Sequence, residues 1–374
     1  MPAATKIHRA DVVGSMLRPP RLVEARAALR AGGLAAEEYR AIEDAAVDDA
    51  IRIQEEAGVD VVTDGEMRRD VFFDPFLKGL TGFEMRPSYT VRFRNGDSDV
   101  AMEVPIPFTV VERVRALPCP ALEELAYARQ RTEKPIKVTL PSPLMVTGFW
   151  NEASRDAYPD PYELIIDAGE AIRRWFRELA DAGCTYIQLD APDLAELHAD
   201  ARVRAEWESR GFDARSLLDL GTDLAESFAA QDLPGVTTAM HVCKGNGTQA
   251  WIAEGGYESF SRHVFARCPS YDVFHLEYDD ERSGGFEPLA KLPDDKVAVL
   301  GLVSTKWTRL EDPAELAARI EDAAGFHPKD HLAIATQCGF ASASETAEQR
   351  RITEQTQRDK LALVARVARE IWGR

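Results

Sequence analysis

Long apolar runs and cysteines are both scarce in this 374-residue sequence. It has five cysteines and no stretch approaching the ~18–20 apolar residues that cross a bilayer. An odd and widely scattered set of cysteines argues against a disulfide framework, so we expect reduced thiols. Positively charged residues are also outnumbered, because the sequence has 45 Lys and Arg but 63 Asp and Glu. The net charge of −18 argues against an extended surface for nucleic acid or an anionic membrane.

The N-terminal residues lack the apolar core of a secretory signal. The 45% apolar composition is ample for a large hydrophobic core. We therefore expect a cytoplasmic protein with no nucleic-acid partner and no membrane partner. A homo-oligomer is left open.

Eight short apolar, β-branched runs alternate with segments of helical periodicity, as at 34–58, 162–183, 312–325 and 345–374. This alternation predicts an α/β fold, a (β/α)8 TIM barrel that forms one domain over 1–374. The pattern is interrupted after the second run at 80–118, where strand-like alternation predicts a hairpin or lid insertion. The expected strands are 11–15, 59–66, 136–143, 186–192, 237–246, 273–280, 297–304 and 332–339.

Polar residues with metal-binding chemistry gather where the expected strands end. His241 and Cys243 stand two residues apart in the fifth strand, so their side chains share one face. Glu277 lies at the end of the sixth strand and Cys338 at the end of the eighth. Because active sites of these barrels lie at the C-terminal strand ends, the four groups can meet at one centre. An imidazole, two thiolates and a carboxylate suit tetrahedral Zn²⁺, which can ionise a substrate thiol at neutral pH.

Other interpretations of the same residues stay open at this point. Buried thiols also occur as small hydrophobes, His241 suits a hydrogen-bonded core imidazole, and Glu277 suits a surface ion pair. His275 shares the strand face of Glu277 but lies deeper, so we interpret it as a core residue. A zinc hydrolase would more usually have His and carboxylate ligands, and a non-catalytic binding barrel would keep the fold without turnover.

Six ordered motifs are spread over the chain: "VVGSMLRP", "VVTDGEMRRDVFFDPF", "YIQLDAPDLAE", "HVCKGN", "HLEYDD" and "ATQCGF". Together they resemble the C-terminal catalytic barrel of the cobalamin-independent methionine synthase family, over essentially the whole chain. The resemblance implies transfer of a methyl group to the thiol of homocysteine. It also implies that a catalytic Zn²⁺ is held by His241, Cys243, Glu277 and Cys338.

The same resemblance implies substrate-binding residues. Glu66 and Asp190 match the acidic residues that hold the homocysteine amino group, and Ser15 matches the turn that receives its carboxylate. This pairing is chemically sound, because carboxylates bind an ammonium while hydroxyl and backbone N–H groups bind a carboxylate. Glu196 matches an acidic residue near the folate substrate, and Trp150 is placed to stack on a planar donor. Ion pairs with arginines, a plain turn and a half-buried aromatic are the structural alternatives for these positions.

Three departures from the family pattern bear on the reaction. Typical members have two barrels, of which the first helps to hold a polyglutamylated folate, and this chain has one. The alkyl donor is therefore left open between a folate, a corrinoid and an epoxide. Lys306 stands where the family has a proposed proton-donor histidine, and we predict it, with Asp190, as a catalytic residue if burial and the metal lower its pKa. Ala191 replaces the glutamate of the usual "DEP" motif.

These departures also fit epoxyalkane:coenzyme M transferase, a related single-barrel activity in which a zinc-bound thiolate of coenzyme M opens an epoxide. Retention of Glu66 and Asp190 favours an amino-acid thiol, since carboxylates repel a sulfonate. The sequence thus predicts a zinc-dependent thiol alkyltransferase that acts first on homocysteine, and alternatively on coenzyme M or another small thiol. Cations available for a sulfonate are Arg18, Arg68, Arg69 and Lys306.

Overall fold

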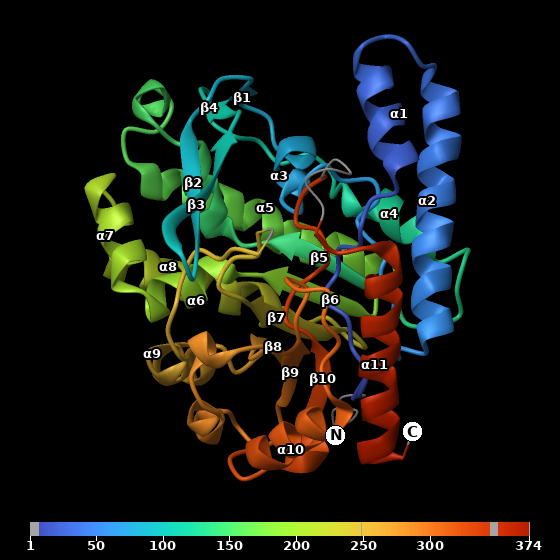
Figure 1. The fold of residues 1–374 in the computed structure, drawn as a ribbon. Helices are drawn as coiled ribbons and strands as arrows, with labels where there is room; N and C mark the ends of the chain where they lie inside the picture. Colours follow the sequence, from blue (N-terminus) through green and yellow to red (C-terminus); the bar gives the residue numbers. More distant parts are fainter. Residues whose placement is uncertain (1–6, 248, 345–350, 374) are drawn as a thin grey trace.

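Six parallel strands make up the central sheet of the computed structural model, which describes residues 7–247, 249–344 and 351–373. The strands are β5 (Lys137–Pro141), β6 (Tyr186–Asp190), β7 (Thr237–Val242), β8 (Val273–Glu277), β9 (Val297–Val303) and β10 (Leu332–Thr336). They are hydrogen-bonded in the order β10-β9-β8-β7-β6-β5, so consecutive strands lie side by side (Figure 1). Their residues are almost all buried, which explains why they read as apolar runs.

The two edges of this sheet are connected through the first two predicted strand segments. Ala10 forms a parallel bridge with Ile334 of β10, and Val62 forms one with Ile136, just before β5. Between these segments, the N–H of Asp60 donates to the carbonyl of Ala10 at 2.9 Å. The contacts place both segments at the remaining positions of the barrel, so the predicted (β/α)8 fold is confirmed.

The first two segments do not form full strands, however, and the expectation of strands over 11–15 and 59–66 is wrong in extent. The side chain of Gln54 takes the place of a strand partner. Its amide donates to the carbonyl of Thr63 at 2.8 Å and accepts from the N–H of Thr63 at 2.9 Å. Gly65 and Glu66 then have φ angles of +71° and +56°, in the left-handed region that ends an extended segment.

The helices predicted at 34–58, 162–183 and 312–325 are confirmed as α2 (Ala36–Ala57), α5 (Pro161–Asp181) and α10 (Pro313–Ala323). Of the helix predicted at 345–374, α11 covers Glu354–Trp372, whereas 345–350 and 374 lie outside the described residues. The other helices are α1 (Pro20–Arg30), α3 (Asp74–Gly79), α4 (Ala121–Ala128), α6 (Pro192–Ala199), α7 (Ala201–Ser209), α8 (Ala214–Ala229) and α9 (Glu258–Phe260).

The helices cover the outside of the barrel. Helices α2 and α11 pack against each other, and α11 contacts β10. Helices α5, α6 and α8 lie on the side of the barrel away from α2 and α11 (Figure 1). The guanidinium of Arg9 lies 5.0 Å from the ring centre of Trp372, so the first and last described segments are adjacent.

A hairpin is inserted after the second segment, which confirms the predicted insertion within 80–118. Its antiparallel strands are β2 (Tyr89–Asn95) and β3 (Ser98–Ile106), and short strands β1 (Phe83–Glu84) and β4 (Thr109–Val110) pair near its base. The hairpin packs closely on the loop that follows β7, because a Cβ on Gly247 would lie 2.6 Å from Cε of Met102. A lid function for the hairpin stays a prediction.

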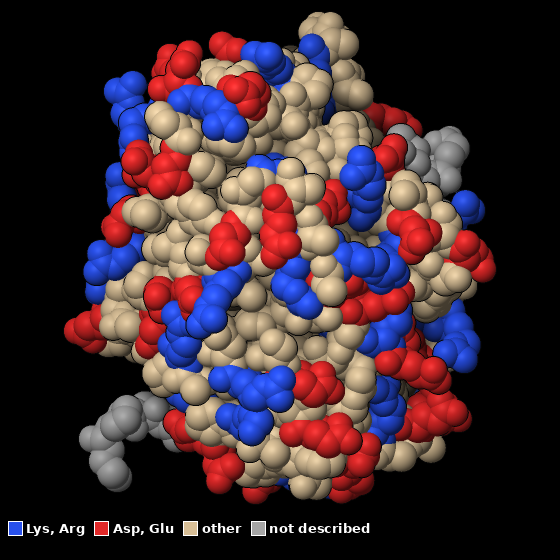
Figure 2. Space-filling view, turned by 90° about the vertical axis from the view of Figure 1, so that its left-hand side faces the viewer, with Lys and Arg blue, Asp and Glu red and all other residues tan. Residues whose placement is uncertain are grey.

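The described residues include no helix that combines the length and the apolarity needed to cross a membrane. On the face drawn in Figure 2, Lys and Arg side chains are interspersed with Asp and Glu. A mixture of both signs is typical of a solvated protein surface.

Candidate metal centre and substrate site

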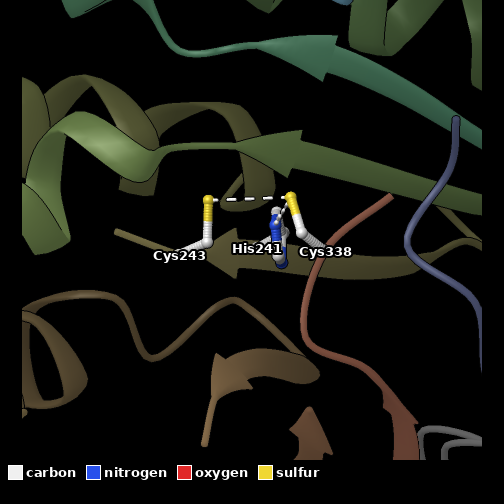
Figure 3. A group of neighbouring side chains, drawn as sticks. All are labelled: His241, Cys243 and Cys338. Atoms are coloured by element: carbon white, nitrogen blue, oxygen red, sulfur yellow. Dashed lines mark hydrogen bonds between the residues drawn. The ribbon is translucent and has the colours of Figure 1, made fainter. Parts of the chain in front are cut away.

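Three of the four predicted metal ligands lie together at the C-terminal end of the barrel. His241 lies in β7, Cys243 follows that strand directly, and Cys338 lies two residues beyond β10. All three are buried, and one ligand atom from each lies within 4.8 Å of the others (Figure 3). The sulfur of Cys338 is 3.9 Å from the sulfur of Cys243 and 3.7 Å from Nε2 of His241.

The geometry of these three atoms fits a zinc ion. Zn–S bonds of ~2.3 Å and Zn–N bonds of ~2.0–2.1 Å place tetrahedral ligands about 3.8 Å apart for two sulfurs and about 3.6 Å apart for sulfur and nitrogen. The observed distances of 3.9 Å and 3.7 Å agree with these values. The hydrogen bond with Cys338, followed by burial, raises the pKa of Cys243 well above its usual range. The thiol of Cys243 therefore needs a nearby cation to become a thiolate.

Glu277, the predicted fourth ligand, lies outside this three-residue group. It is fully buried at the end of β8, where Oε1 accepts from Nζ of Lys306 at 3.0 Å and from Nη2 of Arg282 at 3.1 Å. Oε2 accepts from the N–H of Lys244 at 2.8 Å. Burial disfavours the charge, but the surrounding cations outweigh it and lower the pKa of Glu277. Glu277 is therefore an anion with its own donors, and its binding to metal stays a prediction.

Lys306 lies between two carboxylates. Its Nζ is 3.0 Å from Oε1 of Glu277 and 3.1 Å from Oδ2 of Asp279. Burial alone would lower the pKa of Lys306, but these two anions raise it above its usual range. The environment of Lys306 therefore does not lower its pKa, although its predicted role as a proton donor required a lowered pKa. Lys306 is placed to neutralise Glu277, and proton donation by it stays a prediction.

Glu66 follows the second segment and is buried in the barrel mouth. Its Oε1 accepts from Oγ1 of Thr139 at 2.9 Å and from Nη1 of Arg69 at 3.4 Å. Its Oε2 is buried with no hydrogen-bond partner among the described residues, although a guanidinium nitrogen of Arg18 lies 3.8 Å away. Burial raises the pKa of Glu66 to about 7, against the opposing effect of the two arginines. Such a carboxylate has room for one more cation.

Ser15 lies beside the turn that carries Cys338. A Cβ on Gly339 would meet Oγ of Ser15 at 2.0 Å, so only glycine allows this approach. The N–H of Phe340 donates to the carbonyl of Ser15 at 2.8 Å. The two turns are therefore joined, and Ser15 contacts the glycine that directly follows Cys338.

Asp190 ends β6 directly opposite His241 of β7. Its Oδ1 accepts from Nε2 of Gln188 at 2.7 Å, and burial raises its pKa. Its negative charge also contributes to the raised pKa of Glu66. Ser15, Glu66 and Asp190 thus lie at the end of the barrel that also carries His241, Cys243 and Cys338, and their binding of substrate stays a prediction.

The two residues predicted near the alkyl donor differ in their surroundings. Glu196 of α6 has a buried Oε1 with no hydrogen-bond partner among the described residues, and burial raises its pKa well above the usual range. Trp150 belongs to the hydrophobic core. Its Nε1 donates to the carbonyl of Tyr158 at 3.1 Å and its ring packs edge-on against Phe212. These are contacts of a core side chain and give the predicted stacking on a donor no support.

Arg282 follows β8 at the C-terminal end of the barrel, whereas Lys137 begins β5 deeper in the barrel, and sequence reasoning selected neither. Arg282 contacts Glu277, and its only signal was a basic residue in the acidic stretch "DDERS" after the sixth strand. Lys137 donates to Nε2 of His275 at 3.0 Å and to Oδ1 of Asp11 at 2.7 Å. His275 is buried, as expected, but it belongs to an ionic network that no local sequence pattern predicts.

We expect Glu66→Gln to stabilise the protein at pH 8 by about 3 kcal/mol and to have little effect at pH 4. Because burial raises the pKa of Glu66 from 4.5 to about 7, the folded chain keeps a proton in that window that the unfolded chain has lost. Stability from this group is therefore present at low pH and lost as pH rises towards 7. Urea unfolding of both proteins at the two pH values measures the difference.

The control is Glu37→Gln in the exposed first turn of α2, which should change stability by less than about 0.5 kcal/mol at either pH. Equal effects of Glu66→Gln at pH 4 and pH 8 would show that Glu66 does not titrate in this window.

The structure is thus a (β/α)8 barrel with two thiols and an imidazole gathered at the C-terminal ends of its strands. A family model described as "Cobalamin-independent synthase, Catalytic domain" matches residues 9–358. The chain belongs to this family. Its members are methyltransferase-type enzymes that act on small molecules.

Relatives support this membership across the whole chain. The protein YxjG of Bacillus subtilis (strain 168), described as uncharacterized, is 35% identical over 371 residues, which cover 97% of this chain and 94% of YxjG. The crystal structure of a putative vitamin-B12 independent methionine synthase from Listeria monocytogenes is 27% identical, with a TM-score of 0.73 and coverage of 99% and 100%. A B12-independent methionine synthase from Shewanella sp. W3-18-1, at 22% identity, TM-score 0.75 and 98% coverage of both chains, shares the fold.

Proposed function

We propose that this protein is a zinc-dependent thiol alkyltransferase that transfers a methyl group to the thiol of homocysteine. The observation that carries the proposal is the buried group of His241, Cys243 and Cys338, whose ligand atoms lie within 4.8 Å of one another. Two soft thiolates and one imidazole suit a zinc ion that binds a further sulfur. Membership of the cobalamin-independent synthase family supports the same class of reaction.

Bound zinc would supply one effect, which is to lower the pKa of the substrate thiol so that it is a thiolate at neutral pH. The residues of the chain would orient the substrate. Glu66 and Asp190 would hold its ammonium group, while the hydroxyl of Ser15 would receive its carboxylate. With both ends of the amino acid held, the sulfur is directed to the metal group and towards the alkyl donor, which favours in-line attack.

The charges around the site favour an amino-acid thiol over coenzyme M. Burial raises the pKa of both Glu66 and Asp190, and an ammonium placed between them would relieve this cost. The cations that a sulfonate needs already have carboxylate partners: Lys306 pairs with Glu277 at 3.0 Å, and Arg69 pairs with Glu124 at 2.7 Å. Alkylation of coenzyme M, as in epoxyalkane:coenzyme M transferase, therefore ranks second. Among the described residues, no contact distinguishes a folate from a corrinoid as the alkyl donor.

The test is to load the full-length protein with Co(II) and to titrate it separately with homocysteine and with coenzyme M. We expect homocysteine to produce a saturable sulfur-to-cobalt charge-transfer band in the near ultraviolet, because its thiolate becomes a metal ligand. Coenzyme M should produce a weaker response at the same concentration. A saturable band with coenzyme M alone would reverse the order of the two substrates, and no band with any small thiol would contradict the proposed reaction.

A further inference from the structure

The ladder between β7 and β8 opens where the two strands reach the metal group. Its register ends with the pair of Val242 and Leu276. Continued by one residue, a parallel ladder would pair Cys243 with Glu277 and bond the N–H of Glu277 to the carbonyl of Val242. The hydroxyl of Tyr257 lies between these two groups instead. It accepts from the N–H of Glu277 at 2.8 Å and donates to the carbonyl of Val242 at 2.7 Å.

This hydroxyl separates the two strand ends. Two hydrogen bonds in series hold the N–H of Glu277 and the carbonyl of Val242 farther apart than the ~2.9 Å of a direct ladder bond. The next position differs as well, because the N–H of Lys244 donates to the side-chain Oε2 of Glu277 at 2.8 Å, where a regular ladder would use the backbone carbonyl. The opening thus gives the carboxylate of Glu277 its position beside the segment that carries Cys243.

Tyr257 is itself held in place by its surroundings. It is 1% exposed, and its ring packs against that of Tyr278 with 5.3 Å between the ring centres. The ammonium of Lys244 lies 3.8 Å from the ring centre of Tyr257. Burial raises the pKa of Tyr257 well above its usual range, so the hydroxyl keeps its proton and continues to donate. Tyr257 therefore contacts both chain neighbours of Cys243, which are Val242 and Lys244.

We propose that Tyr257 is a positioning residue whose hydroxyl sets the separation of the β7 and β8 ends and so places Cys243 for metal binding. The proposal rests on the metal site of the proposed function. The sulfur of Cys243 lies 3.9 Å from that of Cys338, as two thiolates on one zinc ion require (Figure 3). Cys243 directly follows β7, so a shift of this strand end would change the distance. Hydrogen-bonded groups behind the ligands fix ligand orientation in metal sites generally.

The test is Tyr257→Phe in the full-length protein, which removes the hydroxyl and keeps the ring. Zn²⁺ affinity is measured by competition with a chelator, and the arrangement of the ligands by the visible d–d bands of the Co(II) form. We expect Tyr257→Phe to bind Zn²⁺ about tenfold more weakly and to shift the Co(II) bands. The reason is that the strand ends either close to form the direct bond or keep two buried backbone groups without a partner.

The matched control is Tyr271→Phe. Tyr271 is also fully buried, and its hydroxyl also donates to a backbone carbonyl, that of Ala225 in α8 at 3.0 Å. This variant loses a comparable hydrogen bond far from the strand ends, so it should match the wild type in Zn²⁺ affinity and in the Co(II) bands. Wild-type affinity and unshifted bands in Tyr257→Phe would overturn the proposal, as would equal weakening in Tyr271→Phe.

A second measurement keeps both hydrogen bonds and applies even if Tyr257→Phe does not fold. With 3-fluorotyrosine in place of Tyr257, fluorine NMR reports the surroundings of the hydroxyl. Loading with Zn²⁺ should shift this resonance, because the metal fixes the strand ends to which the hydroxyl is bonded. 3-Fluorotyrosine in place of Tyr271 should show no shift. A resonance at position 257 that does not respond to Zn²⁺ would also overturn the proposal.

The proposed function and the role of Tyr257 fail in different ways. If the wild type binds Zn²⁺ but homocysteine gives no thiolate band, the proposed reaction is contradicted, and the Zn²⁺ affinities of the variants still decide the role of Tyr257. If the wild type gives the band and Tyr257→Phe binds Zn²⁺ as the wild type does, the proposed function stands and the positioning role does not.

Discussion

Cys338→Ala is expected to remove nearly all bound zinc from the purified protein and to abolish thiol alkylation. Cys338 supplies one of three ligand atoms and is the only one of them contributed from outside the β7 segment. Its loss leaves two ligands from one strand end, which is too few for a tetrahedral site. We expect the zinc dissociation constant to rise about a thousandfold or more. Metal analysis of the dialysed protein and chelator competition measure the two effects.

The matched control is Cys119→Ala. Cys119 is also buried, at 3% exposure against 8% for Cys338, but it lies in the hydrophobic core away from the metal group. This variant should keep full zinc content while losing a modest amount of stability from the small cavity. Full zinc content in Cys338→Ala, or equal zinc loss in both variants, would contradict the assignment of the three-residue metal group.

Asp190→Asn is expected to raise the KM for homocysteine about 10- to 100-fold with zinc content unchanged. The reason is that a buried carboxylate bound to an ammonium forms a charge-assisted pair, and the amide keeps the shape of the side chain but not its charge. Steady-state kinetics with homocysteine, beside metal analysis of the same sample, measures the change.

The sharpest form of this test uses 4-mercaptobutyrate, which is homocysteine without its amino group. Wild type and Asp190→Asn should turn over this thiol with similar KM values, because the lost interaction involves only the ammonium. Glu43→Gln serves as the control, since Glu43 is buried but pairs with Arg68 on the outer side of the barrel. An equal rise in KM for both thiols would assign Asp190 a structural role and not contact with the amino group.

Local pattern was sufficient to predict that the side chains of His241 and Cys243 lie together. Residues two apart in a strand project from the same face, and this holds wherever the strand lies in the fold. The barrel itself followed from eight repeats of an apolar run and an amphipathic helix. The same reasoning overextended the second strand, because the side chain of Gln54 occupies the position of a strand partner at Thr63. A side chain that takes the hydrogen bonds of a missing neighbouring strand produces no periodic pattern in the sequence.

The partners of charged residues could not be predicted in the same way. Lys306 reads as a proton donor beside a metal, yet Glu277 and Asp279 flank its ammonium group and raise its pKa. Trp150 is predicted to stack on a planar donor, yet its contacts with Tyr158 and Phe212 place it in the core. In both cases the deciding neighbours come from other segments, and electrostatic and packing energies depend on distance in space.

The sequence by itself determined the repeating βα architecture, the family and the residues proposed as metal ligands, because periodicity and residue chemistry are local properties. Only the tertiary structure decided that Cys338 meets His241 and Cys243, since β10 and β7 are separated by two strands in the sheet and the curvature of the barrel brings their ends together. It alone also placed Arg282, Lys306 and the N–H of Lys244 on Glu277. The strength of a carboxylate as a ligand depends on the donors around it, and those donors come from three different loops at the end of the barrel.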